Sequence, residues 1–555
     1  MMFPENSQID GKYSPEIKCR WKSYVNYKLL LWAWMMNETT TMLSPTMVSH
    51  TGFYVHVFLQ TVTIILIGIP LVYSEICLAQ YTNCNIFTMW NYFPLFQNVG
   101  YGTFYLVILK TIYILVLAAW YAVYTFHSAL DVPPWLNCDD FVNCKCMVKR
   151  INVSLFQHCL EAQMLFNANC EINTASKCFF EREIGHNCTA NSLQCLYPWK
   201  ILAAIVVVCV SIYILSIKKD KFIQAVVKVE AFYVSVVIIV LFCIAMSTSG
   251  TWYASKINIR WDHYGFQSCL ESITAAFLSL GTGYGIIMFL TRDVPFRSPA
   301  TMTSICIPLF SIFLSLMFGL IAFSGIKTMS YYHGEEENVV ENGNSFYFLP
   351  FASMSEIMSY FGTTPVWVFL WFSVIFLCLY VNFWILYLFT RDLLFDSIVI
   401  FREYSKTSCL FVLLLIICIT LPFLCSDLTI VLTDATEIIQ IIQSLLFSIS
   451  HYWIYGFRNH NIDIIFMIGI KANYFWKSLW LLNPIFIMVI LYNKISTLLI
   501  FYHVPFMEDE NYNTSYFISL AILWAMSVTL VFLRISSFLI RSRRETPSIA
   551  LGIYI

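Results

Sequence analysis

Charged residues are scarce in this sequence. Asp, Glu, Lys and Arg make up 12% of its 555 residues, whereas hydrophobic residues make up 59%. A typical soluble domain carries about 25% charged residues, so this composition excludes an ordinary soluble protein. The basic residues are few and lie beside apolar segments rather than in patches, which gives nucleic-acid binding no support.

Patterns that mark catalytic sites are also missing. The sequence has no metal-ligand spacing, phosphate-binding loop or nucleophile elbow. The run Gly281-Thr-Gly-Tyr-Gly285 resembles part of a dinucleotide fingerprint, but it follows no strand and opens no soluble helix. We therefore expect neither an enzyme nor a bound cofactor. Residues 1–24 lack the apolar core of a cleavable signal peptide, so the first span is expected to direct its own insertion.

What the sequence does contain is a series of long apolar runs. Crossing a hydrocarbon core of about 30 Å takes roughly 20 apolar residues in a helix. Ten continuous candidates lie near residues 54–79, 103–126, 199–217, 222–246, 301–325, 365–390, 408–424, 435–457, 475–496 and 515–540. Two further candidates, near 25–49 and 267–291, are interrupted. The sequence thus predicts an all-α polytopic membrane protein with twelve transmembrane helices.

The two interruptions are the most informative feature of the chain. Residues 279–285 place three glycines at alternate positions, and polar residues 37–41 break the first span. Open backbone at bilayer depth is tolerated only where it is buried in protein or lines a wet cavity. Secondary transporters build their central binding sites from such broken helices. The alternative is that residues 25–49 form an interfacial helix and a loop.

Basic residues give the expected orientation. They follow the even-numbered spans, which places both termini, residues 1–24 and 541–555, in the cytoplasm. The loop 128–198 is then extracellular, and it holds eight of the nineteen cysteines. Such a set predicts disulfides, with Cys138 and Cys144 the nearest pair.

Sequons on the same side support this orientation. Asn152 and Asn187 lie in the loop 128–198, and Asn513 precedes the last span. Their Asn-X-Ser/Thr patterns predict glycosylation at extracellular positions.

Several strings in combination resemble the sodium- and chloride-dependent neurotransmitter transporter family. They are Gly68-Ile-Pro-Leu-Val-Tyr-Ser-Glu-Ile-Cys-Leu-Ala-Gln-Tyr81, Trp90, Phe93-Pro-Leu-Phe-Gln-Asn-Val-Gly-Tyr101, Pro134-Trp-Leu-Asn-Cys138, Ser279-Leu-Gly-Thr-Gly-Tyr-Gly285 and Tyr452-Trp-Ile-Tyr-Gly456. The resemblance implies two inverted five-helix repeats, residues 25–246 and 267–457, followed by helices eleven and twelve in 475–540. It also implies a plasma-membrane carrier of amino acids or amines that uses Na+ and Cl−.

The resemblance implies gates on both sides of the membrane. On the cytoplasmic side, Trp21 and Lys18 match the family's amino-terminal gate, and Asp396 matches its partner. The alternative is that Lys18 and Asp396 are solvated boundary charges. On the outer side Asp434 matches the family's acidic residue, but Leu43 replaces the arginine it should meet.

Ion positions are only partly kept. For sodium, the matching positions hold Thr40, Ser279 and Ile307 at one site and the Val381-Asn382 pair at the other, with the seventh-helix asparagine and the eighth-helix aspartate lost. For chloride, Tyr73, Ser279 and Ser311 match, while Ala275 replaces a glutamine. Ion coupling is therefore either weakened or carried by other residues.

Glu38 is the candidate replacement. A carboxylate in mid-span costs about 2.5–3.5 kcal/mol on insertion scales and is a functional-site hypothesis by default. The alternative is a different register of the first span that leaves Glu38 in water. The residues expected to line a substrate site are Asn37, Glu38, Tyr113, Ser279, Gly281, Gly283 and Tyr284. Half-helix amino ends near these residues would favour a substrate carboxylate.

The sequence leaves two functions open. The first is a secondary active transporter of amino acids or amines, held in the lipid bilayer and working by alternating access. The second is a transport-deficient relative with a structural or regulatory role, favoured by the losses at Leu43, Ile307 and Val381. The apolar end Gly552-Ile-Tyr-Ile555 is a weak signal for a protein contact.

Overall fold

The structure of this chain is a computed structural model. It describes residues 24–90, 96, 98–136, 146–147, 173–184, 199–217, 220–248, 265–333, 349–362, 365–424, 426–469 and 471–503. These residues are almost entirely helical. Their one pair of strands is a short parallel bridge between β1 (Cys146–Met147) and β2 (Asn173–Thr174).

Within the described ranges, nine helical segments are long and apolar enough to cross a membrane. They are Phe53–Thr82, Val99–Ser128, Trp199–Ile217, Ala225–Ser247, Ala300–Met329, Val366–Ser397, Ser405–Leu424, Leu428–Ile454 and Tyr474–Leu498. Each coincides with a continuous span predicted from the sequence, which confirms an all-helical polytopic membrane protein. The last predicted span, 515–540, lies outside the described residues, so the total of twelve stays a prediction.

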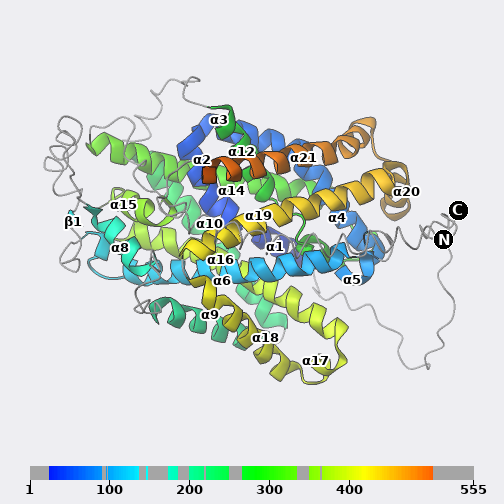
Figure 1. Ribbon diagram of the computed structural model, residues 1–555, viewed down its shortest axis with the longest axis horizontal. Coiled ribbons are helices and arrows are strands. Elements are labelled where there is room, and N and C mark those ends of the chain that lie inside the picture. The colour runs from blue at the N-terminus through cyan, green and yellow to red at the C-terminus, as the bar shows by residue number, and fades with distance from the viewer. Residues whose placement is uncertain are drawn as a thin grey trace.

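The elements that form these segments follow one another along the chain. They are α3 (Phe53–Thr63) with α4 (Ile69–Thr82), α6 (Val99–Ser128), α9 (Trp199–Ile217), α10 (Asp220–Ser247), α14 (Ala300–His333), α16 (Val366–Ser397), α18 (Ser405–Thr420), α19 (Ser426–Ser448) and α21 (Tyr474–His503). Shorter helices are α5 (Ile86–Met89), α8 (Ala175–Glu183), α15 (Met354–Ser359), α17 (Val399–Glu403) and α20 (Phe457–Ile468). Figure 1 shows α8, β1 and α15 at one end of the bundle and α5 and α20 at the other.

Helices α6 and α16 form the most extensive interface of the bundle. The buried Tyr124 of α6 packs there against Phe372 of α16, and both Tyr124 and Trp120 also contact Phe351, which lies in the turn Leu349–Ser353. The outward faces of α9 and α10 are apolar instead, because Val207 and Phe232 are 68% and 72% exposed. An apolar outer surface around a packed interior is suited to lipid rather than water.

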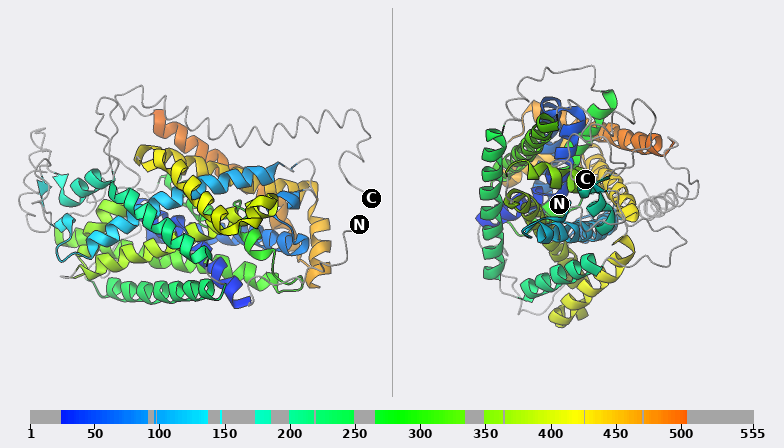
Figure 2. Two further views of the ribbon diagram at one scale, coloured as in Figure 1. Left: turned by 90° about the horizontal axis from the view of Figure 1, so that it is seen from below. Right: turned by 90° about the vertical axis from the view of Figure 1, so that its left-hand side faces the viewer.

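The first broken span runs through the interior of this bundle. Helix α1 (Tyr24–Met35) ends before Asn37, a wide π-helical turn follows at Thr39–Leu43, and α2 (Ser44–Thr51) continues onward. Residues 37–43 are all buried, and α1 contacts α10, α14, α16 and the short helix α13 (Ile286–Thr291). Figure 1 shows α1 near the middle of the bundle's outline, and Figure 2 shows that the start of the chain's first helix, in the deepest blue, reaches the edge of the bundle. The burial of residues 37–43 contradicts the alternative of an interfacial helix with Glu38 in water.

The second break separates α12 (Phe266–Leu278) from α13 (Ile286–Thr291). Its glycines are required by the backbone, because Gly281 and Gly283 have φ angles of +59° and +83°. Residues with a side chain rarely adopt such angles. A Cβ on Gly283 would also lie 2.8 Å from the backbone oxygen of Gln440. Both discontinuous helices predicted from the sequence are therefore present.

Replacing Gly283 with Ala should destabilise the fold. The strained φ of +83° and the close backbone oxygen of Gln440 together cost about 1–3 kcal/mol. We expect the purified variant to melt at a lower temperature than the wild-type chain. Gly265→Ala is the matched control, because a Cβ there meets nothing within 4 Å. Equal melting temperatures of the two variants would contradict the described geometry of the break.

Candidate functional site

The two broken spans meet each other inside the bundle. Asn37 Nδ2 donates a hydrogen bond of 2.9 Å to the backbone oxygen of Ser279. Trp34 Nε1 donates to the backbone oxygen of Gly281 at 3.3 Å. All four residues are buried. Asn37 and Ser279 are 242 positions apart in the sequence, and Trp34 and Gly281 are 247 positions apart. The four residues nevertheless form one polar centre.

The Asn37 side chain also fixes the shape of the first break. Its Oδ1 atom accepts hydrogen bonds from the backbone nitrogen of Thr40 at 3.1 Å and from the Thr40 hydroxyl at 3.2 Å. The same hydroxyl is 3.0 Å from the backbone oxygen of Met35. The Oδ1 atom of Asn37 therefore stabilises the turn of the first break, and its Nδ2 atom joins that break to the second one.

Asn382 of α16 reaches the first break as well. Its Nδ2 atom donates to the backbone oxygens of Met36 at 2.8 Å and Cys378 at 3.1 Å. Asn382 belongs to the pair matched to the second sodium site, which also uses carbonyls of the first helix. An amide donor of the chain therefore bonds a carbonyl near that site.

Two further side chains bind the backbone around the second break. Glu75 of α4 accepts a 3.0 Å hydrogen bond from the backbone nitrogen of Gly283 through its Oε1 atom. Gln440 of α19 donates to the backbone oxygen of Leu278 at 3.4 Å. The sequence prediction did not include Glu75. The available signal was a carboxylate within the predicted span 54–79, which is a functional-site hypothesis by default.

Glu38 forms a buried ion pair with Lys110 of α6, hereafter the Glu38–Lys110 pair. The Thr39 hydroxyl donates to the same carboxylate oxygen at 3.3 Å. The Lys110 ammonium also lies 5.2 Å from the ring centres of Tyr113 and Tyr284. Such cation–π contacts contribute about 0.5–2 kcal/mol each, with the larger values at sites shielded from water.

Lys110 was missed by the sequence prediction. It lies in the middle of the apolar run 103–126, where a charged residue is costly and rare. That rule applies to Lys110 as much as to Glu38. Glu38 and Lys110 are opposite charges in two different apolar spans, and this is the sequence signal for their pairing.

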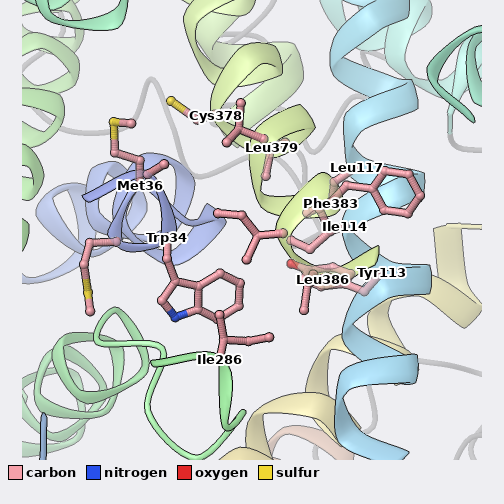
Figure 3. Packing of buried hydrophobic residues seen from close by; sticks show 14 of the residues in the cluster. Trp34, Met36, Tyr113, Ile114, Leu117, Ile286, Cys378, Leu379, Phe383 and Leu386 are labelled. Carbon is pink, nitrogen blue, oxygen red and sulfur yellow. The ribbon is translucent and has the colours of Figure 1, made fainter. Parts of the chain in front are cut away.

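An apolar wall surrounds this centre. Its buried side chains come from the first span, α6, α13 and α16 and lie close together in Figure 3: Trp34, Met36, Tyr113, Ile114, Leu117, Ile286, Cys378, Leu379, Phe383 and Leu386. The Trp34 indole meets the Tyr284 ring edge-on, with 5.8 Å between ring centres. Few polar groups among mainly apolar walls are typical of sites for small molecules.

On the α2 side of the centre, apolar contacts replace the expected polar ones. Leu43, Met47 and Ala275 form a small buried cluster. Leu43 and Ala275 stand where the family resemblance implies an arginine and a glutamine. The two replacements therefore lie together and close this side of the break without charge.

Asp434 has a different partner from the one that the resemblance implies. Lys494 Nζ of α21 lies 3.1 Å from Asp434 Oδ1 and 2.5 Å from Glu437 Oε2. All three side chains are largely buried. Helix α19, which carries Asp434 and Glu437, packs on α21 and also on α6, which carries Lys110.

The predicted chloride residues are not joined by hydrogen bonds among the described residues. Tyr73 stacks on Trp480 with ring centres 6.3 Å apart. The Ser279 hydroxyl donates to the backbone oxygen of Ala276 at 2.8 Å. Ser311 is fully buried in α14. Their roles as chloride ligands therefore stay predictions.

On the opposite side of the break, Asp396 pairs with Arg292 at 3.2 Å. A small cleft there is lined by residues of α5, α13 and α16, including Met89, Met288 and Phe389, and by Asn85 and Gly285, which directly precede α5 and α13. Lys18 and Trp21, the predicted partners of this gate, lie outside the described residues.

The predicted extracellular sites also fall largely outside the described part of the chain. This applies to Cys138, Cys144, Asn152, Asn187 and Asn513. Cys178, one of the eight cysteines of the loop 128–198, is disulfide-bonded. The pairing of Cys138 with Cys144 stays a prediction.

Comparison with known proteins gives consistent matches over most of the chain. The profile of the sodium:neurotransmitter symporter family matches residues 44–544. The sodium-dependent serotonin transporter of Drosophila melanogaster is 26% identical over 76% of this chain and 68% of its own length. The sodium-dependent dopamine transporter of Caenorhabditis elegans is 23% identical over 91% of this chain and 85% of its own length. The sodium- and chloride-dependent neutral and basic amino acid transporter B(0+) of Mus musculus is 24% identical over 77% and 71%.

Replacing Lys494 with Met should destabilise the protein strongly. The change leaves Asp434 and Glu437 buried side by side without their shared cation, and breaking a buried pair in this way costs about 3–5 kcal/mol. Thermal melting of the purified variant measures the loss. Adding Asp434→Asn and Glu437→Gln to the same variant should recover most of it. Lys477→Met on the same helix is the control, and an equal effect of both Met substitutions would contradict the ion pairs.

Proposed function

Because this chain belongs to the sodium:neurotransmitter symporter family, we propose that it is a secondary active transporter that moves amino acids or related small amines by alternating access. One observation carries the proposal: Asn37 and Ser279 join the two helix breaks in the interior of the bundle. Broken helices that meet at membrane depth are the usual construction of a transporter's central site. The proposed location is the plasma membrane, with both termini cytoplasmic and repeats at 25–246 and 267–457.

The chemistry of the centre supports the substrate class. The Glu38–Lys110 pair provides one carboxylate and one ammonium group, next to the amide of Asn37, which is bonded within the chain. The apolar wall lies directly beside these groups. A small solute that carries both charged and apolar parts finds partners for each of them here. We assign the binding role to Asn37, Glu38, Tyr113, Ser279, Gly281, Gly283 and Tyr284, now with Lys110.

Alternating access is supported by the difference between the two sides of the break. The Leu43, Met47 and Ala275 cluster is buried and closes the α2 side. On the other side, the cleft beside Arg292 reaches Gly285 at the end of the second break. The Arg292–Asp396 pair lies at this mouth. Movement of α2 and α13 relative to α16 would exchange the open and closed sides.

Sodium and chloride are the proposed co-transported ions, because the names of the relatives state these dependences. Thr40, Ser279 and Asn382 are the retained candidates for sodium, and Tyr73, Ser279 and Ser311 for chloride. The loss of oxygen ligands at Ile307 and Val381 makes a proton gradient the alternative driving force. Glu38 is then the residue that would exchange the proton.

Uptake into proteoliposomes tests this function. Purified chain is reconstituted, and a panel of labelled amino acids and amines is offered under a sodium gradient, a proton gradient or neither. We expect accumulation of at least one solute that collapses when an ionophore dissipates the driving gradient. No uptake from protein that is correctly inserted and glycosylated would favour a non-transporting relative.

Replacing Asn37 with Ala should reduce that uptake. The variant loses the hydrogen bond to Ser279 and the two from Thr40, so the two breaks are no longer held in register. Misplacement of a site by about 1 Å costs up to 100-fold in rate, and we expect kcat/KM to fall by roughly 10–100-fold. Asn459→Ala, at an exposed hydrogen bond, is the matched control. Unchanged uptake by Asn37→Ala would contradict the role of the joined breaks.

A further inference from the structure

Four backbone oxygens at the two breaks already accept hydrogen bonds from side chains of the chain. They are the oxygen of Met36, which accepts from Asn382, that of Leu278 from Gln440, that of Ser279 from Asn37 and that of Gly281 from Trp34. A free sodium ion needs several oxygen ligands around it, as other hard cations do. Each of these four oxygens would have to give up or share its present donor to serve as one.

The positions that match sodium ligands have also lost oxygen. Ile307 and Val381 are buried apolar residues, so neither side chain can ligate a cation. Glu38 remains as the carboxylate of the first break. A buried carboxylate requires a positive charge or a proton nearby, because its desolvation is otherwise uncompensated.

Lys110 supplies that positive charge. Its ammonium group contacts Glu38 directly, and both side chains are less than 10% exposed. The ring centres of Tyr113 and Tyr284 lie 5.2 Å from the same ammonium group. The other buried ammonium group of this region, that of Lys494, is held by Asp434 and Glu437 instead. Lys110 is therefore the cation that neutralises the first break.

We propose that Lys110 is a tethered cation, which does at Glu38 what a free sodium ion would otherwise do. It neutralises the carboxylate of the first break and joins that break to α6. A free cation is then not needed at Glu38, and none binds there while the Glu38–Lys110 pair is formed. The inference concerns the same site as the proposed transport function and rests on that function for its meaning, but its test does not use transport.

The test measures whether removing the tether creates a requirement for a free cation. Full-length chain is purified as wild type, Glu38→Gln, Lys110→Ala, and Lys110→Ala combined with Glu38→Gln. Thermal melting is recorded at pH 8.5 in sodium chloride, methylammonium chloride or N-methyl-D-glucamine chloride at equal ionic strength. Alanine leaves space beside Glu38 for a small cation, whereas N-methyl-D-glucamine is too large to enter.

Lys110→Ala should melt well below the wild type in N-methyl-D-glucamine. Sodium or methylammonium should raise its melting temperature by about 2–4 °C more than they raise that of the wild type, as expected for a ligand that binds only the folded state. The double variant should lose this extra stabilisation, because the neutral amide that replaces the Glu38 carboxylate attracts no cation. Lys477→Met is the control for loss of a lysine elsewhere.

Three outcomes would overturn the proposal. The first is a Lys110→Ala variant that gains no more from either small cation than the wild type does. The second is a wild-type sodium stabilisation that Glu38→Gln abolishes, which would place a free ion at Glu38 beside Lys110. The third is a Lys110→Ala variant that folds in none of the three salts while the double variant folds. Absence of uptake in proteoliposomes would contradict the transport function alone and leave this result standing.

Discussion

Polar groups at membrane depth must find their partners within the protein, and the rest of this site depends on that constraint. A break in a spanning helix frees backbone oxygens and nitrogens that lipid cannot bond. Here the two breaks are joined to each other through Asn37 and Trp34, and α4, α16 and α19 supply further donors and acceptors. The geometry of this centre is thus set largely by the hydrogen bonds of its own backbone.

Buried charges are subject to the same constraint, and the free-energy cost of leaving them unpaired is larger. Glu38 and Lys110 are each costly in an apolar interior and are tolerable as a contact pair. Lys494 plays the corresponding role for Asp434 and Glu437. Where the family resemblance implies an arginine at the outer gate, Leu43 packs on Met47 and Ala275 instead. The buried carboxylates of this region are therefore paired with lysines of α6 and α21.

Much of the fold could be predicted from the sequence, because long apolar runs and alternate glycines are local signals. The predicted breaks at 37–41 and 279–285, and their convergence, agree with the structure. The ion pairs could not be predicted in the same way. Lys110 and Lys494 were each visible as charges inside apolar spans, but their partners lie on other spans. Which residues face each other depends on helix rotation and register, which spacing along one chain does not specify.

The central claim is that the first break is neutralised by the chain itself. A high-resolution cryo-electron microscopy map of the wild-type chain in lipid nanodiscs, in sodium-containing buffer, tests it most directly. The account predicts side-chain density for Lys110 that reaches Glu38, with Asn37 within hydrogen-bond distance of the Ser279 backbone oxygen. A Lys110 side chain directed away from Glu38, with a separate ion density in its place, would contradict it.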